Sequence, residues 1–121
     1  MPPFTDRNGS TRTETVAERW ARAGLFFEAA DYAEAARLLA GIVERVPEQV
    51  APRLLLARAY YHSAQLRRAE EQLRAVIARD PGEHYAHLML GRTLERQGRA
   101  AEAAPWLRMA AAFAGDGVAG D

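Results

Sequence analysis

The sequence contains no cysteine and no lysine. Without cysteine the chain has no disulfide, no thiolate nucleophile and no thiolate metal ligand. All sixteen basic residues are therefore arginine, a bias that we attribute, with the abundant alanine, to a GC-rich bacterial genome. The sixteen basic and sixteen acidic residues cancel. Because no basic excess exists to concentrate polyanions, we expect no nucleic-acid partner.

Long hydrophobic runs are also missing. No stretch reaches the roughly 18 apolar residues of a membrane-spanning helix, and residues 1–14 have no apolar core typical of a signal peptide. We therefore expect a cytoplasmic protein that does not contact membranes. Residues 1–14 are polar and lack apolar periodicity, so we interpret them as a flexible tail, and residues 115–121 as a second one.

Residues that support catalysis are scarce. The only serines are Ser10 and Ser63, and no glycine-rich phosphate loop is present. The three histidines are His62, His84 and His87. Three histidines without thiolates are weak evidence for a metal site, and we interpret them as surface and packing residues. The sequence predicts no catalytic residue, metal or cofactor; an enzyme or metal protein built on the histidines is a third hypothesis.

What the sequence does contain is an internal repeat. Small or apolar residues recur at a fixed interval of 34 residues. The landmarks are Ala23, Ala57 and Gly91; Ala35, Ala69 and Ala103; Leu39, Leu73 and Leu107; and Pro47 with Pro81. A fixed period of this length is typical of a repeat array, in which each unit buries its apolar face against its neighbours.

Helix signals divide each unit in two. Thr15 and Glu18 form a capping box, which predicts a helix start. Another start is predicted by Asp80 as N-cap, Pro81 as first-turn proline and Glu83 as capping-box glutamate. Gly98 predicts a helix end in the left-handed conformation. The predicted helices cover about 16–30, 33–46, 51–63, 66–79, 83–97 or 84–97, and 101–114. Short connections require antiparallel neighbours. The pattern predicts a wholly helical protein with six helices and no strand.

These landmarks resemble the tetratricopeptide repeat. The matching residues are Ala23, Phe26, Ala35, Leu39, Pro47; Leu56, Ala57, Tyr60, Ala69, Leu73, Pro81; and Leu90, Gly91, Leu94, Ala103, Leu107. The resemblance implies an all-α fold, a right-handed α-solenoid of three stacked helix-turn-helix hairpins. The repeat domain would cover residues 15–114, with repeats at about 16–49, 50–83 and 84–117.

Two departures from the family pattern carry expectations. Arg19, Arg53 and His87 occupy the position of an early tryptophan, which predicts looser packing within each unit. Arg22 stands where Leu56 and Leu90 stand in the later units. Since no unit precedes the first, we expect Arg22 to face water.

The resemblance implies that the first helix of each unit lines a concave groove. The wall would consist of Ala17, Trp20, Gly24, Phe27, Ala51, Leu54, Arg58, Tyr61, Tyr85, Leu88, Arg92 and Glu95, with Glu28, His62 and Arg96 at the rim. Aromatic residues beside arginines are typical of binding hot spots, and six large apolar residues here would form an exposed patch. The alternative is that each aromatic residue only packs the stack.

Some family members clamp a C-terminal carboxylate with a fixed polar set. The matching positions here are Trp20, Gly24, Leu55, Tyr85 and Met89, which do not support that activity.

A second candidate surface lies on the last helix. Trp106, Met109 and Phe113 form an apolar stripe that the earlier units interrupt with Gly41, Arg45, Gln72 and Arg79. Either the tail folds back over the stripe through Val118, or the stripe forms a weak homodimer or a partner contact.

The sequence therefore favours a non-catalytic protein-interaction adaptor that binds a peptide or helix of a partner protein. The alternative is a self-association module that uses the C-terminal helix.

Overall fold

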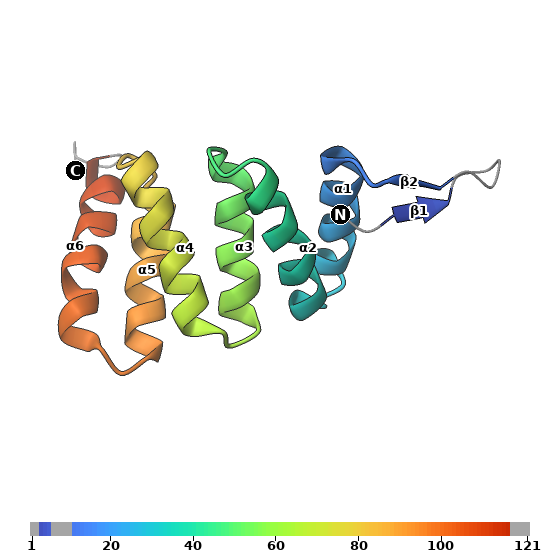
Figure 1. The fold of residues 1–121 in the computed structure, drawn as a ribbon. Coiled ribbons are helices and arrows are strands. Elements are labelled where there is room, and N and C mark those ends of the chain that lie inside the picture. Colours follow the sequence, from blue (N-terminus) through green and yellow to red (C-terminus); the bar gives the residue numbers. More distant parts are fainter. Residues whose placement is uncertain (1–2, 6–10, 117–121) are drawn as a thin grey trace.

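The computed structural model describes residues 3–5 and 11–116 (Figure 1). Its helices are α1 (Val16–Glu28), α2 (Tyr32–Arg45), α3 (Val50–His62), α4 (Leu66–Arg79), α5 (His84–Arg96) and α6 (Ala100–Asp116). Within the described ranges, the six predicted helices are confirmed to within a few residues at each end. They form three helical hairpins stacked in chain order as an all-α solenoid.

The helix ends follow from local chemistry. The Thr15 hydroxyl accepts a hydrogen bond from the Glu18 amide at 3.1 Å, and the Glu18 carboxylate accepts one from the Thr15 amide at 2.9 Å, so the predicted capping box is confirmed. Gly98 has the predicted left-handed conformation, with φ of 75°. Ala30 and Ala64, the equivalent residues of the first two units, have φ of 62° and 60°. All three hairpins therefore turn in the same way, although only one uses glycine.

The predicted start of α5 at Glu83 or His84 is confirmed, but the predicted cap is wrong. Its N-cap residue is Glu83, which makes no side-chain capping bond, and Asp80 ends α4 instead. The Asp80 carboxylate accepts a hydrogen bond from the Gly82 amide at 3.2 Å. The chain therefore turns through Pro81 and Gly82 before the helix begins.

The segment before α1 differs from the expectation of a tail without strands. Strands β1 (Pro3–Thr5) and β2 (Thr11–Thr13) pair in antiparallel fashion, with Phe4 opposite Arg12. The pair projects from the end of the stack that α1 forms (Figure 1). Threonine favours strands, and an Asn8-Gly9 dipeptide between threonine-containing segments is a hairpin signal that could have predicted this.

At the other end α6 extends through Asp116, two residues beyond its predicted end. Residues 117–121, which include Val118 of the tail expected to cover the last helix, lie outside the described residues.

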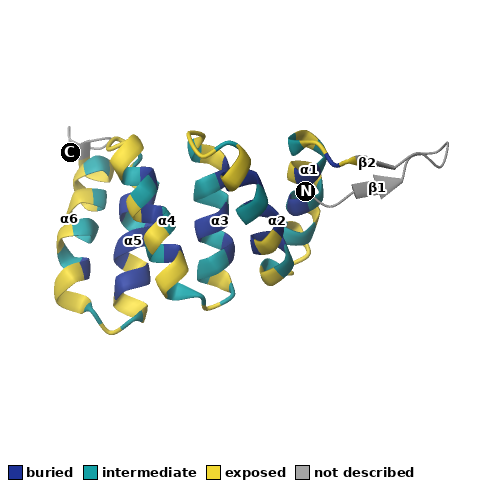
Figure 2. Cartoon of the chain, in the orientation of Figure 1, coloured by how far each residue is buried: buried dark blue, intermediate teal, exposed yellow. Residues whose placement is uncertain are grey.

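Small residues allow the two helices of each hairpin to approach closely. Ala35, Ala69 and Ala103 are fully buried, as are Ala23 and Ala57 (Figure 2). At Gly91 an added Cβ would lie 2.4 Å from the Leu107 side chain. The core continues along the stack, and its largest fully buried side chains include Leu39, Leu56, Leu73, Leu90 and Leu94.

The residues at the family's tryptophan position hold their hairpins together through other contacts. Arg19 Nε donates to the Leu38 carbonyl at 2.8 Å, and Arg53 Nη1 donates to Gln72 Oε1 at 3.0 Å. The His87 ring lies 5.8 Å from the Trp106 ring. Each contact joins the first helix of a hairpin to the second. Polar bonds and ring contacts therefore stand where the tryptophan would pack, and looser packing within each unit stays a prediction.

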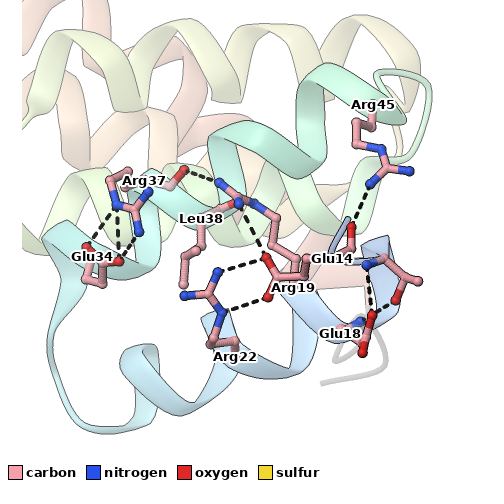
Figure 3. Close-up of polar contacts among 9 residues, drawn as sticks. Glu14, Glu18, Arg19, Arg22, Glu34, Arg37, Leu38 and Arg45 are labelled. Carbon is pink, nitrogen blue, oxygen red and sulfur yellow. Dashed lines mark hydrogen bonds and ion pairs between the residues drawn. The ribbon is translucent and has the colours of Figure 1, made fainter. Parts of the chain in front are cut away.

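Arg22 reaches water as predicted, with 38% of its side chain exposed, but it also makes polar contacts within the chain. It is half-buried and donates two hydrogen bonds of 2.8 Å to the carboxylate of Glu14, which is itself buried (Figure 3). Arg45 Nη1 also donates to the Glu14 carbonyl at 3.2 Å. The hydrogen bond from Arg22 holds the pKa of Glu14 below its ordinary value. Glu14, just before α1, is therefore bound by arginines of both α1 and α2.

Candidate functional site

The predicted groove residues share one face of α1, α3 and α5, which we call the first-helix face. Seven-residue steps from Trp20 to Phe27 and from Leu54 to Tyr61 keep these side chains aligned on successive turns. Trp20 is 39% exposed. Phe27, Leu54, Tyr61 and Tyr85 are half-buried because they pack on the core, and Leu88 is half-buried as well. The six apolar residues of the predicted patch are therefore exposed in part. Each aromatic residue packs the stack and also reaches the surface.

One end of this face holds a pocket of about 480 Å³. It lies where α1 and α3 begin, with a mainly apolar lining of Val16, Ala17, Trp20, Ile42, Gln49, Ala51 and Pro52. Trp20 forms a wall that remains accessible to solvent. A pocket of this kind suits an apolar side chain of a ligand.

The middle of the face is organised around Arg58. Its guanidinium carbon lies 5.0 Å from the centre of the Phe27 ring and 5.9 Å from the centre of the Tyr85 ring. These contacts connect α3 to α1 on one side and to α5 on the other. No hydrogen-bond or ion-pair partner is found for Arg58 among the described residues, and its buried Nε lacks an acceptor. The guanidinium is therefore held in place by rings and keeps N–H donors available.

The far end of the face is more polar. Arg92 pairs with Glu95 at 3.3 Å, one turn further along α5. Arg96 lies 4.6 Å from the centre of the Tyr61 ring and donates to the Tyr61 carbonyl at 3.0 Å. Arg92 also borders a hollow of about 320 Å³ between α5 and α6. The two arginines that the sequence placed in register, Arg58 and Arg92, thus differ, because only Arg92 has a carboxylate partner.

Tyr32 was not among the predicted site residues, because it lies on a second helix rather than a first one. Its ring stacks on the His62 ring at 4.6 Å and meets the Phe27 ring edge-on at 5.2 Å. His62, predicted at the rim, is exposed. Tyr32 supports the side chains that border Arg58. The sequence signal was the place of Tyr32 at the start of its helix, close to the end of the preceding first helix that carries Phe27.

The second candidate surface is not the exposed stripe that the sequence predicted. Trp106 packs against the core and lies 5.8 Å from the Arg74 guanidinium, and Phe113 contacts both His84 and His87 at 5.7 and 5.3 Å. Only Met109 is exposed, at 49%. The stripe turns inward because α5 presents two histidine rings to it.

No group of three or more potential metal ligands occurs in the described part of the chain. His84 and His87 instead contact Phe113, and His87 Nδ1 lies 3.0 Å from the Glu83 carbonyl. None of the helices, over the residues described, is long and apolar enough to cross a membrane.

The sequence profile of the tetratricopeptide repeat matches residues 26–89, more than half of the chain. The chain belongs to the tetratricopeptide repeat family. The match covers the end of α1, all of α2 to α4 and the first part of α5, including Phe27, Arg58 and Tyr85. A search of curated proteins finds no significant match.

Solved structures with the same fold include several of MamA. A MamA mutant superimposes with a TM-score of 0.77 and 22% identity over 80% of this chain and 53% of its own. A fragment of MamA from Desulfovibrio magneticus RS-1 superimposes with a TM-score of 0.78 and 22% identity, over 84% of this chain and 58% of its own. MamA MSR-1 superimposes with a TM-score of 0.80 and 18% identity, over 86% of this chain and 60% of its own. At this identity the likeness shows the fold alone. The tetratricopeptide chain spans between 53% and 60% of these three structures.

Proposed function

We propose that this tetratricopeptide protein is a non-catalytic scaffold whose first-helix face is a concave groove for a peptide or helix of a partner protein. The observation that carries the proposal is the combination on one face of the 39% exposed Trp20, its apolar pocket of about 480 Å³ and the ring-bordered Arg58. Interfaces draw most of their affinity from aromatic and arginine residues that fill or border pockets.

Membership of the family supports a protein partner, because proteins of this fold are interaction modules. Three repeats are part of the proposal. They are supported by the regularly spaced landmarks and by the left-handed residues Ala30, Ala64 and Gly98, which stand at equivalent positions of the three hairpins. The likeness to MamA supports the scaffold role only through the shared fold, and the partner of this chain follows from its own surface.

The groove is favoured over self-association through α6. Trp106 and Phe113, two of the three residues that would form the dimer contact, are partly buried against the core and the histidines of α5. The stripe therefore leaves less apolar area for a two-fold contact than the sequence predicted.

Selection from a displayed library of random dodecapeptides tests the proposal. The selected peptides should bind wild type and the Glu71→Ala variant equally, because Glu71 is exposed on the second helix α4. Trp20→Ala should weaken binding by about 2 kcal/mol, roughly 30-fold in Kd, with unchanged helical content. Equal binding by Trp20→Ala and wild type would contradict the groove.

A further inference from the structure

The partner's chemistry follows from Arg58, if the groove proposed above is the binding site. We propose that the partner segment carries a carboxylate that binds Arg58 and, two helical turns away, an apolar side chain that enters the pocket beside Trp20. The two subsites lie on the same pair of helices, α1 and α3. A ligand that fills both would run along the helix axes.

Arg58 differs from the chain's ion-paired arginines. The paired ones are Arg19 and Arg22 with Glu14, Arg37 with Glu34, Arg74 with Glu70, Arg92 with Glu95, and Arg99 with Glu70 and Glu102. Arg53 and Arg96, also on first helices, donate to an amide or carbonyl oxygen instead. Arg58 is half-buried and has only ring contacts over the described residues. Among the described residues of this face, Arg58 is therefore the arginine whose N–H groups no acceptor of the chain engages.

A carboxylate suits this guanidinium better than a neutral acceptor. The Phe27 and Tyr85 rings restrict where the side chain can move, so little rotamer freedom remains to be lost on binding. The planar guanidinium presents paired N–H donors that match the two oxygens of a carboxylate. A half-buried cation without a counter-ion is also partly desolvated at a cost, and a ligand carboxylate offsets that cost.

The spacing of the two subsites restricts the ligand. On α1 the pocket residue Trp20 and the Arg58 neighbour Phe27 are seven residues apart, and on α3 so are Ala51 and Arg58. Seven residues of helix rise about 10 Å. An extended ligand spans that length in about three residues, and a helical one in about seven. The acid and the apolar residue of the partner should therefore be separated by one of these two intervals.

Isothermal titration calorimetry tests the proposal by comparing two peptides. One comes from the dodecapeptide selection, and the other is its analogue in which the acidic residue is replaced by the corresponding amide. Removing the acid should weaken binding to wild type by about tenfold or more, the effect expected from a charged hydrogen-bonded pair. It should have little effect on binding to Arg58→Gln, which already lacks the charge. The matched control is Arg67→Gln, which should behave as wild type because Arg67 is an exposed arginine on the second helix α4, away from the first-helix face.

Several results separate this inference from the groove itself. The carboxylate proposal would be overturned, and the groove retained, by selected peptides that depend on Trp20 but lack an acid at either interval. Peptides that depend on Trp20 and bind Arg58→Gln as tightly as wild type would have the same consequence. Peptides indifferent to Trp20→Ala would overturn the groove. If circular dichroism shows that Arg58→Gln is unfolded, Arg58→Lys replaces it. Arg58→Lys keeps the charge but loses the paired N–H donors. Replacing the acid of the peptide should then reduce its affinity for Arg58→Lys clearly less than its affinity for wild type, and an equal reduction would overturn the proposal.

Discussion

The guanidinium of Arg19 occupies the space in which a side chain at Gly41 would lie. A Cβ built on Gly41 would be 2.6 Å from Arg19 Nη2, which is closer than real contacts allow. From this position Arg19 donates to the carbonyl groups of Leu38 and Arg37 on α2. The missing side chain at Gly41 thus allows a buried arginine to join α1 to α2.

Gly41→Ala should therefore destabilise the protein, although alanine is the better helix former. The new methyl group displaces Arg19 from its two carbonyl partners, and we expect a loss of about 1–3 kcal/mol in the free energy of unfolding. Thermal and urea denaturation followed by circular dichroism measure this loss.

The matched control is Gly24→Ala, also within a helix. No atom lies within 4 Å of a Cβ built there, so the substitution should stabilise the protein by about 0.5–1 kcal/mol. Changes of the same sign in both variants would contradict the packing described for Arg19.

Ala69→Leu tests the close approach of α3 and α4. Ala69 is fully buried, and the added methylene groups should overpack the contact and cost about 1–3 kcal/mol. Ala78→Leu on the same helix is the control, because Ala78 is exposed and should tolerate leucine. An unchanged melting temperature for Ala69→Leu would show that the helices do not meet at this residue.

Stability should fall in acid partly through Glu70. Burial raises the pKa of Glu70, but hydrogen bonds from Arg99, Gln97 and Arg74 outweigh it and lower the pKa from 4.5 to about 2. Because the folded pKa lies below the unfolded one, this carboxylate stabilises the protein above pH 4.5, and the contribution disappears as the pH falls toward 2. Glu70→Gln should cost about 1–3 kcal/mol at pH 7 and reduce the acid dependence of unfolding.

Glu71→Gln is the control for this experiment. Glu71 is the next residue on α4 and is exposed, so its substitution should leave the pH profile of the unfolding free energy unchanged. A Glu70→Gln profile parallel to that of wild type between pH 5 and pH 2 would contradict the role of Glu70.

Trp106→Arg combined with Phe113→Arg should destabilise the monomer. Both rings contact α5, so two charges there would remove apolar packing and lower the free energy of unfolding by about 2 kcal/mol or more. Met109→Arg, at an exposed position on the same helix, should change it by less than about 0.5 kcal/mol. A stable, fully helical double variant would mean that the stripe is a free surface after all.

The repeat period was sufficient to predict the helices, because small residues such as Ala35 and Ala69 mark where two backbones must approach. Ala30 and Ala64 carried no such signal, since alanine rarely adopts positive φ and the hairpin geometry imposes it. Arg58 was predicted to share a face with Phe27 and Tyr85, and it contacts both rings. Its lack of a carboxylate partner was not predictable, because that depends on which arginines reach an acid in three dimensions.

The strands had a local signal in Asn8-Gly9 that was not used. The inward turn of Trp106 was missed because it depends on what the last helix packs against. The sequence shows which residues are apolar but does not show that His84 and His87 of α5 meet the last helix.

The central claim is that partners bind on the first-helix face. Its most direct test is a titration of ¹⁵N-labelled protein with a selected dodecapeptide, following every amide by nuclear magnetic resonance. We predict that the shifted amides cluster on α1, α3 and α5 around Trp20, Arg58 and Tyr85, while the exposed parts of α2 and α4 stay unchanged. Shifts concentrated on α6 around Met109, or on the exposed side of α2 and α4, would contradict it.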